Sequence, residues 1–123
     1  MFAFERLEAW RRCHELSLAV YRVTARWPSA ERFGLTSQVR RAAVSAEANI
    51  AEGAAKRGRA EFRRYLDISI GSLSELACLL QLAADLGLIA DQERADLNRV
   101  REDASKITWL LYKSIARLPS RSL

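Results

Sequence analysis

The sequence predicts an all-α protein, a single antiparallel up-down-up-down four-helix bundle over residues 1–123, from three observations. Ala, Leu, Arg and Glu dominate the composition, with only five Gly and two Pro, which favours helix over strand. Apolar residues recur at steps of three and four along four segments, as on one face of an α-helix. The last three segments are joined by short connections, so we expect consecutive helices to run antiparallel.

The first helix is expected over about residues 4–26. Pro28 cannot continue an α-helical hydrogen-bond ladder, and it disfavours helical geometry at the residue before it, Trp27. Residues 29–35 are therefore predicted to form a loop.

The second helix is expected over about residues 36–55, where Thr36 or Ser37 can serve as the N-cap. Gly58 supplies the turn that follows the helix. Ala, Ser and Gly make up much of this segment, and small side chains let helix axes approach each other closely. We therefore expect the second helix to pack tightly against its neighbours.

The third and fourth helices are expected over about residues 60–86 and 92–118. Gly87 suits the C-terminal cap of the third helix, and Asp91 the N-cap of the fourth. Each helix carries one continuous apolar stripe, which predicts its core face. The stripe of the third helix comprises Phe62, Leu66, Ser69, Leu73, Leu76, Leu80 and Ala83. The stripe of the fourth comprises Leu97, Val100, Ala104, Ile107, Leu111, Ile115 and Leu118.

The first helix differs because it carries two stripes, and a four-helix monomer needs only one of them. One stripe comprises Leu7, His14, Leu18, Tyr21 and Ala25; the nearly opposite one comprises Ala9, Cys13, Leu16, Val20, Val23 and Trp27. Trp109 adds an aromatic residue on the polar side of the fourth helix, and an exposed Trp is typical of an interface. We therefore expect a homo-oligomer with an interface of Cys13, Leu16, Val20, Val23, Trp27 and Trp109. The alternative is a monomer in which the first helix lies deep and Trp109 folds along the surface.

The positive charge is concentrated at one end of the predicted bundle. In this topology both chain termini share an end with the turn between the second and third helices. That end collects eleven basic and five acidic residues, against nine and ten in the remainder of the chain. Arg pairs bidentately with phosphate, and released counterions supply affinity, so this end predicts a footprint for RNA, DNA or another polyanion. Its central residues are Lys56, Arg57, Arg59, Arg63, Arg64 and Arg117.

Two observations bear on the prediction of a nucleic-acid footprint. An arginine-rich face can be a merely solvated surface. Aromatic residues are also sparse at this end, where Phe62 belongs to the core stripe, so base stacking and sequence readout are poorly supported. Binding is expected to depend on shape and charge.

No catalytic or metal-binding pattern is present in the sequence. His14 is the only histidine and has no Cys or carboxylate cluster at metal-ligand spacing. Cys13 and Cys78 lie inside helical patterns without a C-x-x-C motif, which predicts reduced thiols. There is no G-x-S-x-G elbow and no glycine-rich phosphate loop. We expect a protein that is not an enzyme and needs no cofactor.

The sequence predicts no leader and no membrane span. Residues 1–10 carry Glu5, Arg6 and Glu8 without a continuous apolar run, and no stretch approaches the roughly 20 apolar residues of a span. A cytoplasmic protein is expected.

Several motifs together resemble one family. Residues 33–45 (FGLTSQVRRAAVS) and 49–53 (NIAEG) are similar to the signature of four-helix bundle proteins encoded in intervening sequences of bacterial 23S ribosomal RNA genes. The opening Leu7-x-x-Trp10 and residues 64–66 (RYL), 71–76 (GSLSEL) and 86–89 (LGLI) extend the resemblance to about residues 4–118.

The resemblance implies a homopentameric ring of four-helix bundles, similar to the accessory variability protein of diversity-generating retroelements. That protein associates with nucleic acid and a reverse transcriptase, so these are the partners implied here, although many family members have no assigned activity. The resemblance also adds Arg40 and Arg41 to the basic positions. Glu47 departs from the pattern, because relatives often have Pro there; we therefore expect an uninterrupted second helix.

The leading functional hypothesis from the sequence is a non-enzymatic oligomeric adaptor or scaffold that contacts nucleic acid through its basic end. The rival hypothesis is a protein–protein interaction module whose positive charge is incidental.

Overall fold

The computed structural model of the chain describes Phe4 and residues 7–116, and these form helices without any strand. The predicted all-α fold class is confirmed. The elements are helix α1 (Glu8–Thr24), the 3-10 turn η2 (Ser29–Glu31), and helices α2 (Leu35–Ala55), α3 (Arg59–Asp85) and α4 (Asp91–Ala116).

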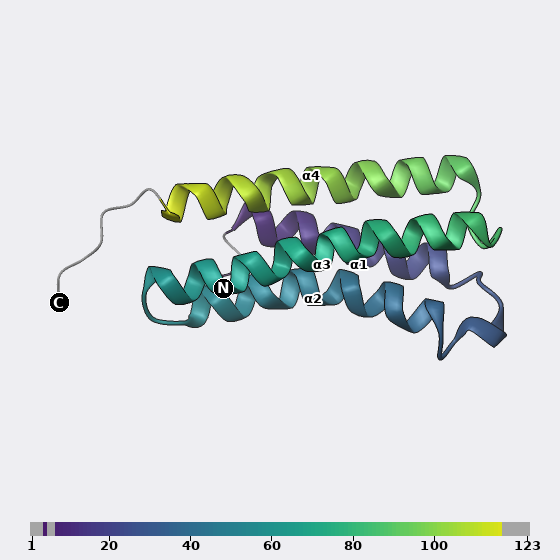
Figure 1. The fold of residues 1–123 in the computed structure, drawn as a ribbon, viewed down its shortest axis with the longest axis horizontal. Helices are drawn as coiled ribbons and strands as arrows, with labels where there is room; N and C mark the ends of the chain where they lie inside the picture. Colours follow the sequence, from purple (N-terminus) through teal and green to yellow (C-terminus); the bar gives the residue numbers. More distant parts are fainter. Residues whose placement is uncertain (1–3, 5–6, 117–123) are drawn as a thin grey trace.

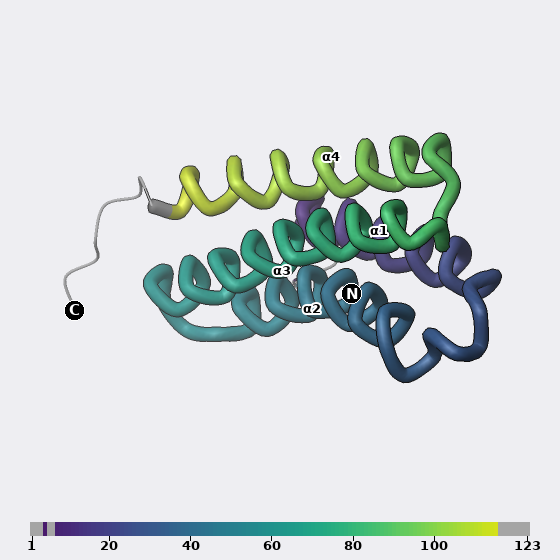
Figure 2. The backbone as a smooth tube through the Cα atoms, turned by 45° about the vertical axis from the view of Figure 1, so that its right-hand side comes forward, coloured from purple at the N-terminus to yellow at the C-terminus, as the bar shows by residue number. Residues whose placement is uncertain are grey.

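The four helices form an antiparallel bundle in which each helix packs against two others. The packed pairs are α1 with α2, α2 with α3, α3 with α4, and α4 with α1. The α2–α3 turn and the described end of α4 lie together at one end of the bundle, on the left in Figures 1 and 2. The other connections lie at the opposite end. This arrangement is the predicted up-down-up-down topology.

Glycine and proline positions predicted the connections well. Gly58 and Gly87 adopt positive φ angles of 87° and 76°, the region that glycine enters without a steric penalty. α1 ends at Thr24, before Pro28. The predicted N-cap of α2 is wrong, because the helix begins at Leu35 and Thr36 turns its side chain into the interior.

The predicted core faces of α3 and α4 are confirmed. Burial in α3 extends over Leu66, Ser69, Leu73, Leu76, Leu80 and Ala83, with Phe62 half-buried. In α4 the buried members are Leu97, Ala104 and Ile115, and the half-buried ones are Val100, Ile107 and Leu111. Leu118 lies outside the described residues.

α2 and α3 approach each other closely, as the small residues of α2 predict. A Cβ atom added to Gly53 would lie 2.7 Å from the Cβ of Tyr65, closer than real Cβ contacts. The Oγ of Ser69 donates a hydrogen bond of 2.7 Å to the carbonyl oxygen of Ala46. α2 also continues without a break through Glu47, as expected for a helix without proline there.

The structure reverses the predicted roles of the two stripes of α1. Cys13, Leu16 and Val20 are fully buried, and Trp27 is buried with them, in the core between α1 and its neighbours α2 and α4. Val23 is half-buried. These side chains are therefore not a surface for a second chain. The other stripe faces outward, because Leu18 and Tyr21 are exposed.

α3 contains a longer apolar stretch than the sequence analysis expected. Among the described residues it is long and apolar enough to cross a membrane, judged by length and composition alone, contrary to the expectation that no stretch approaches a span. Its leucines Leu66, Leu73, Leu76 and Leu80 lie in the bundle core. A core helix of a soluble protein passes the same test, so this is weak evidence for a span.

Candidate nucleic-acid interface

Four cations surround the turn between α2 and α3. Lys56 is the C-cap of α2 in extended geometry, Arg57 follows it, and Gly58 redirects the chain so that α3 begins at Arg59. Arg63 lies one helical turn further along α3. Within the part of the chain that the structure describes, none of these four side chains forms an ion pair. We call Lys56, Arg57, Arg59 and Arg63 the basic turn.

The backbone adds positive potential at the same place. The first N–H groups of an α-helix have no intrahelical acceptor, and the helix dipole is positive there. The N-cap of α3 is Gly58, which has no side chain to accept those hydrogen bonds. Arg59 therefore adds a cation where the helix already favours an anion. Glu61 also lies in the first turn of α3, but its carboxylate pairs with Arg64.

Arg64 was predicted to belong to the binding set, but its guanidinium is engaged within the chain. Its Nη2 lies 3.4 Å from Oε2 of Glu61 and its Cζ lies 4.5 Å from the centroid of the Tyr65 ring. The hydrogen bond to Glu61 is the main cause that raises the pKa of Arg64. The Nζ of Lys56 lies 5.7 Å from the centroid of the same ring, so Tyr65 holds two cations beside the turn.

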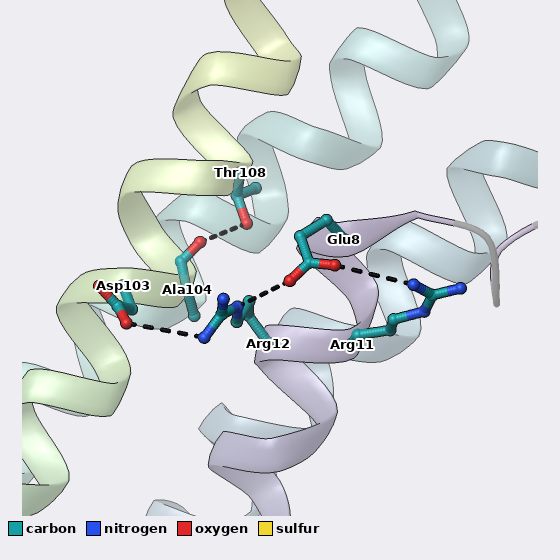
Figure 3. A network of polar contacts seen from close by, with 6 residues as sticks. All are labelled: Glu8, Arg11, Arg12, Asp103, Ala104 and Thr108. Carbon is teal, nitrogen blue, oxygen red and sulfur yellow. Dashed lines mark hydrogen bonds and ion pairs between the residues drawn. The ribbon is translucent and has the colours of Figure 1, made fainter.

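The basic residues of α1 at this end are largely neutralised (Figure 3). Glu8 accepts a 2.8 Å hydrogen bond from Nε of Arg12 and lies 3.7 Å from Nη1 of Arg11. Asp103 of α4 lies 3.8 Å from Nη1 of Arg12. The hydrogen bond to Glu8 is also the main cause that raises the pKa of Arg12. The positive surface is therefore narrower than the sequence predicts and is centred on the basic turn.

The structure separates Arg40 and Arg41 from the basic turn, because sixteen residues of α2 span about 24 Å at 1.5 Å per residue. Nε of Arg40 donates a 2.8 Å hydrogen bond to Oγ1 of Thr24, and its guanidinium lies 4.4 Å from the centroid of Tyr21. Arg40 thus links α2 to α1, and Arg41 is exposed nearby. The two basic positions that the family resemblance adds therefore lie apart from the basic turn, toward the other end of α2. Arg117 lies outside the described residues.

His14 joins a pair that the sequence did not reveal. Its Nδ1 lies 2.8 Å from Oε2 of Glu47 on α2, and its ring stacks on Trp10 at a centroid distance of 4.8 Å. No group of three His, Cys, Asp or Glu side chains that could hold a metal ion occurs among the described residues. The pair forms a second polar link between α1 and α2.

Trp109 lies on the surface of α4, as its polar surroundings predicted, with 48 % of its surface exposed. Its ring stacks on Tyr112 at a centroid distance of 5.5 Å and an interplanar angle of 10°. The Nζ of Lys113 lies 5.9 Å from the Trp109 centroid. The sequence analysis did not identify this pair, which the three-residue spacing of Trp109 and Tyr112 on one helix could have indicated.

The comparisons with known proteins agree with the fold. Residues 5–113 match the family described as 23S rRNA-intervening sequence protein. None of the curated proteins matches the chain. A solved structure of a protein with unknown function from the S23 ribosomal protein family of Bacteroides thetaiotaomicron VPI-5482 aligns with a TM-score of 0.79 and 20 % identity, covering 85 % of this chain and 95 % of that chain. That likeness shows the shared fold, and neither comparison indicates a catalytic family. Since the family match spans most of its length, the chain belongs to the family of 23S rRNA-intervening sequence proteins.

Proposed function

We propose that this chain is a non-enzymatic cytoplasmic adaptor or scaffold that binds the phosphate backbone of nucleic acid through the basic turn. The observation that carries the proposal is the set of cations without ion-pair partners at the N-terminus of α3 within the described residues. Other Arg residues of the bundle, such as Arg12 and Arg64, already have carboxylate partners.

Phosphate is the anion that suits this arrangement. Guanidinium groups bind phosphate oxygens bidentately, and backbone N–H groups at a helix N-terminus are further donors. A backbone contact of this kind carries no sequence information, so affinity is expected to depend on charge more than on base identity. The names of the family and of its solved relative refer to ribosomal RNA and ribosomal proteins, which favours RNA among the polyanions.

The test is binding to labelled RNA across a salt series. A variant carrying Arg57→Gln, Arg59→Gln and Arg63→Gln is compared with a control that loses the same charge at the other end of the bundle, Arg22→Gln, Arg32→Gln and Arg99→Gln. Each lost phosphate contact lowers the log–log salt slope by about 0.7 for single strands. We expect a shallower slope and weaker binding for the first variant and the wild-type slope for the control. Equal losses in both variants would reduce the effect to net charge and contradict the proposal.

We also propose that the chain self-associates through the outward stripe of α1 and the adjoining side of α2. Tyr21 contacts Arg40 and His14 contacts Glu47, so Leu18 and Val44, which lie between these pairs on their helices, are neighbours across the α1–α2 seam. Leu18, Tyr21 and Val44 are all exposed. Such an apolar group favours a partner surface. Several copies would present several basic turns to one nucleic acid and raise the avidity.

A further inference from the structure

The position of the stacked pair Trp109–Tyr112 relative to the basic turn follows from the register of α3 against α4, and one hydrogen bond between these helices indicates that register. Nη1 of Arg94 on α4 donates to Oε1 of Gln81 on α3 at 3.2 Å, so these two residues share one level of the antiparallel pair. Tyr112 follows Arg94 by 18 residues, and Arg63 precedes Gln81 by the same number.

Eighteen residues make five complete turns at 3.6 residues per turn. Tyr112 therefore shares the face of α4 that carries Arg94, and Arg63 shares the face of α3 that carries Gln81. Because both helices rise equally per residue, Arg63 and Tyr112 lie at about the same level on facing sides of α3 and α4. The aromatic pair thus adjoins a cation of the basic turn.

The surroundings of the pair favour a negatively charged, flat partner. Lys113 lies over the Trp109 ring, and Arg59 lies one turn from Arg63 toward the α2–α3 turn. Nearly half of the surface of Trp109 is exposed, although an indole ring is costly to leave in water. Exposed aromatic rings beside a track of cations are the combination that binds single-stranded nucleic acid, where phosphates meet the cations and bases stack on the rings.

Acidic residues border the surface formed by the basic turn and the aromatic pair on the side away from the α2–α3 turn. Asp67 lies one turn beyond Arg63 on α3, and Glu102 lies two turns before Trp109 on α4, and both are exposed. A bound strand is therefore expected to run from the α2–α3 turn along Arg59 and Arg63 and to end at the aromatic pair.

We propose that Trp109 and Tyr112 form a stacking platform for unpaired bases, so that the basic turn binds single-stranded nucleic acid in preference to duplex. This inference rests on the proposed function and adds the class of ligand to it. In a duplex the bases are already stacked on each other, so a surface ring has no base face to cover. It also changes the expectation that base stacking is poorly supported, because α4 brings an aromatic pair toward the basic turn. Of this pair, the sequence analysis considered Trp109 alone and assigned it to oligomerisation.

The test compares affinities for a labelled single-stranded RNA of about 12 nucleotides and for a duplex of the same length. Trp109→Leu removes the stacking ring but keeps an apolar, helix-favouring side chain, and Trp109→Phe keeps an aromatic ring. The matched control is Phe33→Leu, since Phe33 is exposed and lies near Arg32 at the other end of the bundle.

We expect Trp109→Leu to weaken single-strand binding by about 5- to 150-fold with an unchanged salt slope, because stacking is not a counterion effect. Duplex affinity should stay the same, Trp109→Phe should recover most of the loss, and Phe33→Leu should bind as the wild type does. Wild-type affinity in Trp109→Leu, or equal losses for single strand and duplex, would overturn the stacking platform while the salt slope still reports on the basic turn. A wild-type protein that binds neither RNA at low salt overturns the proposed function and this inference with it.

Discussion

Cys13 and Cys78 are expected to differ in thiol reactivity because one is buried and the other is exposed. Cys13 is fully buried, with its Sγ 3.9 Å from Oγ1 of Thr108, and burial raises the pKa of the thiol to about 12. Cys78 is exposed on α3. Because the thiolate is the reactive form, burial protects Cys13 both by restricting access and by keeping the thiol neutral.

We predict that a disulfide reagent at about pH 8 titrates one thiol in the native protein and two in denaturant. The variant Cys78→Ser should show no reactive thiol until it unfolds. Absorbance of the released chromophore gives the count. Rapid reaction of the Cys78→Ser protein under native conditions would contradict the core position of Cys13.

Buried hydroxyl groups provide a second comparison of single residues. Ser17 and Ser69 are both buried. The Oγ of Ser69 donates a hydrogen bond to the carbonyl oxygen of Ala46, whereas the Oγ of Ser17 has no hydrogen-bond partner among the described residues. An unpaired buried polar group destabilises a fold, whereas a paired one contributes modestly to stability.

Ser17→Ala is therefore predicted to raise the free energy of unfolding by about 0.5–1 kcal/mol, and Ser69→Ala to lower it by about 1 kcal/mol. Urea denaturation followed by circular dichroism measures both. Similar losses in the two variants would mean that the hydroxyl of Ser17 is hydrogen-bonded in solution.

At the scale of helices, the α2–α3 pair depends on the small side chains of α2. Gly53 sits against the Cβ of Tyr65 and the ring of Phe62, whereas Gly71 lies in the middle of α3 with no atom near the position of a Cβ. Both glycines are helical, so the same substitution separates backbone propensity from packing between helices.

Gly53→Ala is predicted to lower the free energy of unfolding by about 1–3 kcal/mol, because the clash with α3 outweighs the better helix propensity of alanine. Gly71→Ala, the matched control, should raise it by about 0.5–1 kcal/mol. Thermal and urea denaturation measure the two changes. If Gly53→Ala were stabilising, α2 and α3 would be less tightly packed than described.

At the scale of the whole molecule, the surface that we propose for self-association lies apart from the surface that we propose for nucleic acid. The exposed apolar residues Leu18, Tyr21 and Val44 lie on α1 and α2. The basic turn lies at the end of the bundle where α2 and α3 are joined (Figure 1), and the aromatic pair lies on α4. An oligomer built on the first surface leaves the second free for a ligand.

We predict that Leu18→Glu together with Val44→Glu reduces the mass of the particle in solution, because a buried charge in the seam opposes association. Leu82→Glu is the matched control, since Leu82 on α3 is exposed to the same degree as Leu18, 47 % against 46 %. Light scattering with circular dichroism separates dissociation from unfolding. A wild-type protein that is monomeric at every concentration would contradict self-association through this seam.

Part of the candidate site could be predicted from local sequence. Lys56, Arg57, Arg59 and Arg63 are close in the chain, so any turn at Gly58 brings their backbones together. The engagement of Arg40 could not be predicted, because its partners Thr24 and Tyr21 lie on another helix. The nearness of Trp109 to the basic turn likewise depends on the register of α3 against α4.

The helices themselves followed from the chain alone, because periodicity, Gly58, Gly87 and Pro28 act over a few residues and need no distant partner. The choice between the two stripes of α1 required the neighbouring helices. Both stripes are apolar enough to be buried, and the one whose side chains pack against α2 and α4 entered the core, with Cys13 against Thr108. The stripe with His14 and Tyr21 stayed outside, where His14 contacts the carboxylate of Glu47 and the guanidinium of Arg40 lies over the Tyr21 ring. The free energy of such packing depends on contacts between two helices, so it cannot be predicted from the sequence of one helix alone.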